Sequence, residues 1–103
     1  MKKTILGLAI LLGSVSVVQA HTPLCSCFDN GDNTITCEGG FSDGSSAAGV
    51  AMRIETSDGQ VVLEGKMSED SEFDFNKPAQ DYIVVFDAGE GHRIRVPGKE
   101  IVE

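Results

Sequence analysis

The segment Asp81–Asp87, with the sequence DYIVVFD, is the most informative about the fold, because it places five consecutive apolar residues between two aspartates. In an extended strand, Tyr82, Val84 and Phe86 point to one face and the two residues between them point to the other. A strand that is apolar on both faces is typical of a central, buried position in a sheet. We therefore expect this segment to be the central strand of a β-sheet.

Short alternating segments continue this pattern on both sides of the central strand. Val50, Met52 and Ile54 alternate with polar or small residues, and an Asp58-Gly59 pair then favours a hairpin turn. The other segments that we expect to be strands are Thr34–Cys37, Val61–Glu64, Glu72–Asn76 and His92–Val96. The chain after residue 20 contains no window with a helical period. About six or seven short strands joined by Gly, Pro and Asp turns predict an all-β fold, a small antiparallel β-sandwich.

The first twenty residues predict secretion. Lys2 and Lys3 precede an apolar run from Ile5 to Val18, and Ala20 ends a segment of the kind that signal peptidase cleaves. We expect cleavage after Ala20, a periplasmic or secreted location and no remaining transmembrane segment. The expected organisation is a signal peptide at 1–20, a cysteine-containing N-terminal arm at 21–40 and a β-sandwich domain at 41–103.

The charge of the chain excludes one class of partner. The chain holds 8 Lys and Arg against 16 Asp and Glu, a formal net charge of −8, and the expected leader carries two of the lysines. A chain this acidic offers no basic surface to phosphate groups, so we expect no nucleic-acid partner. The acidic excess fits a soluble extracytoplasmic protein.

Three cysteines gather near the start of the processed chain, at Cys25, Cys27 and Cys37. In an oxidising compartment one disulfide is expected, and Cys37 pairs more easily with Cys25 or Cys27 than these two do with each other. One thiol is then left over. The alternative is that the three thiolates hold Zn(II) or Cu(I), with His21 as a fourth ligand.

Two stretches resemble known modules. Phe41–Val50, followed by Asp58–Val61 and by Phe73–Phe86, resembles carboxypeptidase-regulatory-like and transthyretin-like modules. The segment Asp87–His92, with the sequence DAGEGH, resembles the DAGxGH segment of periplasmic accessory domains of nickel and cobalt transporters of the energy-coupling-factor type. The resemblance implies an Ig-like sandwich, and it implies a link to transition-metal uptake with a membrane transporter as partner.

The two histidines are the candidate metal ligands. After cleavage His21 would carry both an α-amine and an imidazole, and His92 follows a glycine-containing turn. If the N-terminal arm reaches this turn, three nitrogens meet in a set that suits Cu(II) or Ni(II), and the resemblance adds Co(II) to the candidate ions. Asp87 or Glu90 would act as a further ligand or would orient His92.

The expected function is therefore binding of nickel, cobalt or copper by a small extracytoplasmic β-sandwich that assists the uptake or trafficking of the metal. The alternative is a structural or protein-interaction module that is stapled by a disulfide and binds no metal. The chain contains no nucleophile elbow, no phosphate-binding loop and no zinc-protease motif, so we expect no enzyme activity. The loop Asp29–Asn33 lacks the EF-hand glycine and glutamate, and we expect it to be a turn.

Overall fold

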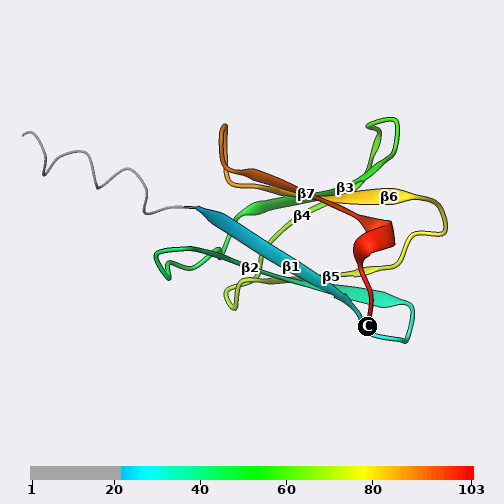
Figure 1. Ribbon diagram of the computed structural model, residues 1–103, viewed down its shortest axis with the longest axis horizontal. Helices are drawn as coiled ribbons and strands as arrows, with labels where there is room; N and C mark the ends of the chain where they lie inside the picture. Colours follow the sequence, from blue (N-terminus) through cyan, green and yellow to red (C-terminus); the bar gives the residue numbers. More distant parts are fainter. Residues whose placement is uncertain (1–21) are drawn as a thin grey trace, which may run out of the picture.

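The computed structural model describes residues 22–103 and forms two stacked antiparallel sheets (Figure 1). The first sheet has the strand order β1-β2-β5, and the second has the order β4-β3-β6-β7. The bounds are β1 (Pro23–Asp29), β2 (Thr34–Phe41), β3 (Ala51–Thr56), β4 (Val61–Lys66), β5 (Glu72–Asn76), β6 (Tyr82–Asp87) and β7 (Arg93–Pro97), followed by a 3-10 turn, η2 (Gly98–Glu100). The expected all-β sandwich is confirmed. The signal peptide expected at 1–20 and the candidate ligand His21 lie outside the described residues.

The segment DYIVVFD forms β6, which lies between β3 and β7 inside the four-stranded sheet. Val84 pairs with Ile54 on one side and with Val96 on the other. Val84 and Phe86 are fully buried, as is Val85 on the opposite face of the strand. The central position that the two-sided apolar pattern predicts is confirmed.

The core lies between the two sheets and combines inward-facing residues of β2, β3, β5 and β6 with residues of the connecting and C-terminal segments. The core residues are buried and pack against one another; they are Ile35, Cys37, Ala47, Met52, Ile54, Met67, Phe75, Tyr82, Val84, Phe86 and Ile101. The ring of Phe86 packs against that of Phe41 with centroids 6.0 Å apart, so it joins the two layers. Burial of these apolar side chains is the main favourable term of folding.

The expected hairpin turn at Asp58-Gly59 connects β3 and β4. Gly59 has a φ of +91°, and its N–H donates to the carbonyl of Thr56 at 2.9 Å. The side chain of Thr56 also hydrogen-bonds to Asp58. A positive φ costs glycine nothing, which explains why this residue ends the turn.

Residues 22–40 belong to the same sandwich. β1 and β2 pair along their full length and make up two of the three strands of the first sheet. Ile35 and Cys37 of β2 are fully buried in the common core. The described part of the expected arm is therefore packed into the sandwich and is not a separate unit. Within residues 22–103, no helix is long and apolar enough to cross a bilayer.

Candidate functional site

The β6–β7 turn carries the candidate ligand His92. The turn is closed by two backbone hydrogen bonds, from Ala88 N to His92 O at 3.0 Å and from His92 N to Gly89 O at 2.8 Å. Gly89 and Gly91 have φ values of +113° and +80°, which side-chain-bearing residues adopt rarely. The glycines of the DAGEGH segment therefore serve the shape of the turn.

His92 is exposed at the end of this turn, and its ring has a defined orientation. Nδ1 lies 3.2 Å from the carbonyl oxygen of Glu90. Because a carbonyl oxygen only accepts, Nδ1 is the donor in this bond, and in the neutral form of the ring the lone pair is then on Nε2. His92 shares a shallow surface hollow with Phe41, Ser45 and Ala88. The arrangement leaves one imidazole nitrogen free to bind a ligand from solvent.

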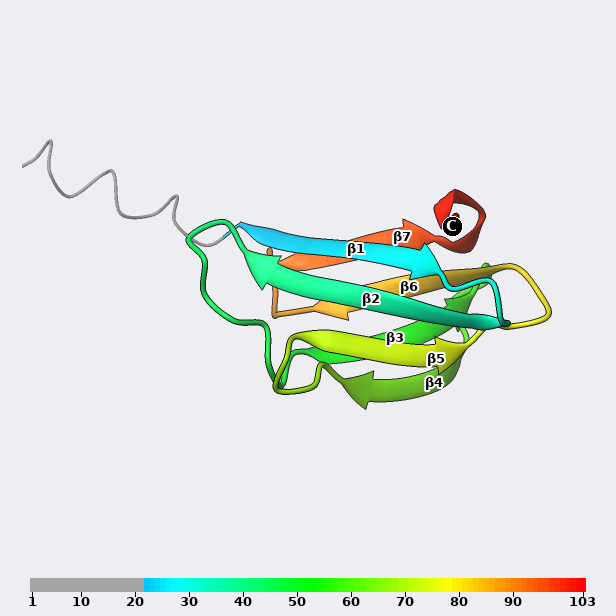
Figure 2. The ribbon, with the colours of Figure 1, turned by 90° about the horizontal axis from the view of Figure 1, so that it is seen from below.

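The start of β1 lies at the same end of the sandwich as this turn (Figures 1 and 2). Thr22 pairs with Ser42 through two hydrogen bonds, from Ser42 N to Thr22 O at 2.8 Å and from Thr22 N to Ser42 Oγ at 3.1 Å. Ser42 follows Phe41, which lines the hollow of His92. Thr22 is thus hydrogen-bonded to the residue that follows Phe41, one of the residues that line the hollow of His92.

Asp87 is engaged by two arginines. Its Oδ2 accepts a hydrogen bond from Arg53 Nη1 at 2.8 Å, and its Oδ1 accepts one from Arg93 Nε at 2.9 Å and one from Gly89 N at 3.0 Å. The Arg53 guanidinium, the Gly89 N–H and the Arg93 guanidinium hold the pKa of this carboxyl well below its usual range. Both oxygens are therefore committed to ion pairs, whereas Glu90 is exposed in the turn.

The ion pairs of Asp87 belong to a larger network on the outer face of the four-stranded sheet. Glu55 is only 7% exposed and accepts hydrogen bonds from Arg53 Nε and from Arg95 Nη2, both at 3.0 Å. The two arginines lower the pKa of Glu55, although burial opposes them. This network is not among the candidate sites expected from the sequence. Its signal in the sequence is the alternation of charged with apolar residues, at Arg53 and Glu55 along β3 and at Arg93 and Arg95 along β7.

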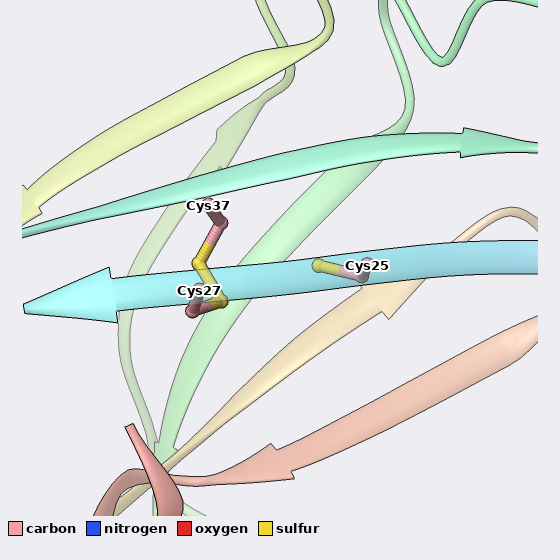
Figure 3. Close-up of side chains that lie close together, drawn as sticks. All are labelled: Cys25, Cys27 and Cys37. Atoms are coloured by element: carbon pink, nitrogen blue, oxygen red, sulfur yellow. A yellow bond between two sulfur atoms is a disulfide. The ribbon is translucent and has the colours of Figure 1, made fainter. Parts of the chain in front are cut away.

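The three cysteines form a second cluster, inside the first sheet (Figure 3). Cys27 and Cys37 are directly opposite each other in the β1–β2 register and form a disulfide, with Cα atoms 4.0 Å apart. The sequence predicts one free thiol without assigning it, and the structure leaves it on Cys25, whose sulfur points along β1 toward the disulfide. All three Sγ atoms lie within 4.8 Å of one another.

The cluster consists of a structural disulfide and a neighbouring thiol, Cys25, that is partly buried. Burial raises the pKa of the Cys25 thiol to about 11, so this thiol is protonated at neutral pH. A metal prefers thiolates, and two of the three sulfurs are already bonded to each other. The disulfide indicates an oxidising, non-cytoplasmic compartment.

The loop between β1 and β2 is a hydrogen-bonded turn, as expected. Asp29 Oδ1 accepts from Gly31 N at 2.9 Å, and Asp29 Oδ2 pairs with Lys77 at 2.9 Å. Asp32 accepts from both the N–H and the hydroxyl of Thr34. The acidic side chains therefore cap the turn and the start of β2.

Comparisons with known proteins do not place the chain in a family. No family model matches it, and neither the curated proteins nor the solved structures contain a match.

Proposed function

We propose that this protein is an extracytoplasmic β-sandwich that binds a transition metal, Ni(II), Co(II) or Cu(II), and assists its uptake or trafficking. His92 would bind through Nε2, and His21 would bind through its imidazole and its α-amine. The observation that carries the proposal is the hydrogen bond from His92 Nδ1 to the Glu90 carbonyl. Such a bond to the other ring nitrogen is the usual way in which proteins orient a ligating imidazole.

The position of Thr22 supports the second half of the ligand set. Its two hydrogen bonds with Ser42 fix the beginning of the described chain next to the residue that follows Phe41, which lines the hollow of His92. In this proposal the preceding residue, His21, supplies the imidazole and α-amine ligands. Nitrogen donors of this type suit Ni(II) and Cu(II), and open positions would be filled by water or by Glu90.

Asp87 takes a supporting role in this proposal. Its carboxylate accepts from Gly89 N, so the pairs with Arg53 and Arg93 fix the turn that presents His92. Glu90 is the carboxylate of the segment that remains available to a metal.

The role in uptake rests on the likeness of the DAGEGH segment to transporter accessory domains. In that role the protein would pass its metal to a membrane transporter and would catalyse no reaction. The rival proposal, a disulfide-stapled interaction module without a metal, is supported by the Cys27–Cys37 bond and by the exposed apolar residues of β4.

Calorimetric titration with Ni(II), Co(II) and Cu(II) separates the two proposals. The protein is produced by secretion, and its first residue is checked by mass. The metal site predicts one-to-one binding that is lost in His92→Gln and kept in Ser45→Ala, a control in the same hollow. The affinity should fall in acid, because only a neutral imidazole binds a metal.

A Cys25→Ser variant tests the competing thiolate site. Binding at the histidines survives this change, whereas binding at a sulfur cluster does not. Loss of binding in Cys25→Ser with retention in His92→Gln contradicts the histidine site, and no binding by any form favours the interaction module.

A further inference from the structure

The two long sides of the sandwich differ in how they are closed. β1 and β7 lie along one side, and β4 and β5 lie along the other (Figure 2). At the Asp29 end of β1 this side is closed by the C-terminal segment, whose Val102 carbonyl accepts from Asp29 N at 3.0 Å and whose Ile101 is 7% exposed. Ile101 itself has extended backbone geometry. On this side, an extended segment bonds to an edge strand and inserts an apolar side chain between the sheets.

The β4–β5 side has no such cover among the described residues. β4 is the terminal strand of its sheet, and Val61, Val62 and Leu63 are 40%, 46% and 42% exposed. Edge strands with consecutive exposed apolar residues are sites to which another strand adds. In the β3–β4 register, Ile54 lies opposite Leu63 and Glu55 lies opposite Val61. Val62 therefore has no partner residue on β3.

A groove of about 590 Å³ runs between β4 and β5. Its apolar lining includes Val62 and Leu63 from β4 and Phe73 from β5. The ring of Phe73 packs so closely on Gly65 that an added Cβ would lie 2.5 Å from its Cε1. Apolar side chains of two edge strands therefore form the floor of the groove.

The charge of the groove selects its occupant. Glu64 and Asp74 line the groove, and the described lining contains no lysine or arginine. The chain as a whole has a net charge of −8, so a second copy of it would be repelled. The acidic and apolar lining of the groove therefore favours an occupant that has basic and apolar side chains.

We propose that the β4–β5 groove binds an extended segment of a partner protein in which apolar residues alternate with lysine or arginine. The segment adds to the free edge of β4 and inserts its apolar side chains over Phe73, as the C-terminal segment does with Ile101 on the opposite side. This interaction surface is separate from the metal site and does not depend on it.

The test is a titration of the full processed protein, in the presence of a chelator, with the end-blocked peptide Lys-Val-Lys-Val-Lys-Val-Lys, followed by backbone amide NMR. The expected shifts concentrate on β4 and β5. The matching Glu-Val peptide should bind at least about tenfold more weakly, because electrostatic complementarity sets specificity. Raising the salt concentration should weaken binding of the lysine peptide.

Matched variants locate the site. The double change Glu64→Gln/Asp74→Asn should weaken binding of the lysine peptide by about tenfold, and Leu63→Ser should weaken it as well. Glu38→Gln/Glu100→Gln removes the same charge from exposed positions outside the groove and should leave binding unchanged. The proposal would be overturned if both peptides bound equally or if both double variants weakened binding equally. It would also be overturned if sedimentation showed a dimer and the NMR spectra placed the dimer contact at β4.

Discussion

Arg53 of β3 and Asp87 of β6 form an ion pair across the outer face of the four-stranded sheet, with Arg53 Nη1 2.8 Å from Asp87 Oδ2. The pair is diagonal, since Arg53 is in register with Val85. Arg93 of β7 holds the other oxygen of Asp87. A single carboxylate thus links three neighbouring strands at the base of the turn that presents His92.

This relationship predicts the behaviour of the fold in acid. Arginine and backbone donors lower the pKa of Asp87, so its ionised form stabilises the folded state. That contribution is fully present above the ordinary value of 3.8 and is lost as the pH falls toward the lowered folded value. We expect Asp87→Asn to lower the urea midpoint at neutral pH and to differ progressively less from the wild type below about pH 4.

The matched control for this prediction is Asp70→Asn, a change at an exposed residue of the β4–β5 turn. It should shift the urea midpoint little at any pH. A loss in Asp87→Asn that stays constant down to the most acidic conditions would contradict the role of the ionised carboxylate.

The fold class could be predicted from local patterns because strand alternation reports directly on burial. The DYIVVFD segment is apolar on both faces, and both faces are buried only when the strand lies between two other strands and is covered above and below. Asp58-Gly59 likewise marks its hairpin locally, because the turn needs a positive φ. These features depend on residues that are close together in the sequence.

Other features could not be predicted from the sequence, because they depend on which strands are neighbours and on how their residues are paired. β1 escaped prediction because its outward residues Leu24 and Phe28 are larger and more exposed than the cysteines that face inward. The choice of Cys27 over Cys25 as the partner of Cys37 follows only from the β1–β2 register. The capture of Asp87 by arginines of β3 and β7 requires knowledge of which strands are neighbours.

The disulfide is predicted to be a major source of stability for this small domain. Cys27 and Cys37 are separated by 10 residues in the sequence. Closing a loop of this size stabilises the fold by about 2–3 kcal/mol through the entropy of the unfolded chain. The double variant Cys27→Ala/Cys37→Ala should therefore lose at least about this much free energy of unfolding in urea titrations. Reducing the wild type should lower stability comparably, and Cys25→Ala, which leaves the disulfide intact, should be affected much less.

Cys25 is predicted to be an unreactive thiol in the folded protein. Burial raises its pKa to about 11, and the thiolate is the species that alkylating reagents attack. Its reaction with iodoacetamide should be slow at neutral pH and should accelerate by roughly tenfold per pH unit up to that range. Unfolding in urea with the disulfide intact should make the reaction fast at neutral pH. Rapid alkylation of the native protein at neutral pH would show that the thiol is not protected.

Gly65 is predicted to be indispensable to the packing of β4 on β5. A Cβ at this position would lie 2.5 Å from Phe73 Cε1, so Gly65→Ala forces the ring or the strand to move and should destabilise the fold by about 1–3 kcal/mol. The matched control is Gly40→Ala on β2, where the nearest atom lies 4.0 Å from the new Cβ. Phe73→Leu replaces the ring by a smaller side chain and relieves the clash. The double variant Gly65→Ala/Phe73→Leu should therefore lose less free energy of unfolding than the sum of the losses in the two single variants. Strict additivity in this cycle, or equal stability of the two alanine variants, would mean that Phe73 does not pack on Gly65.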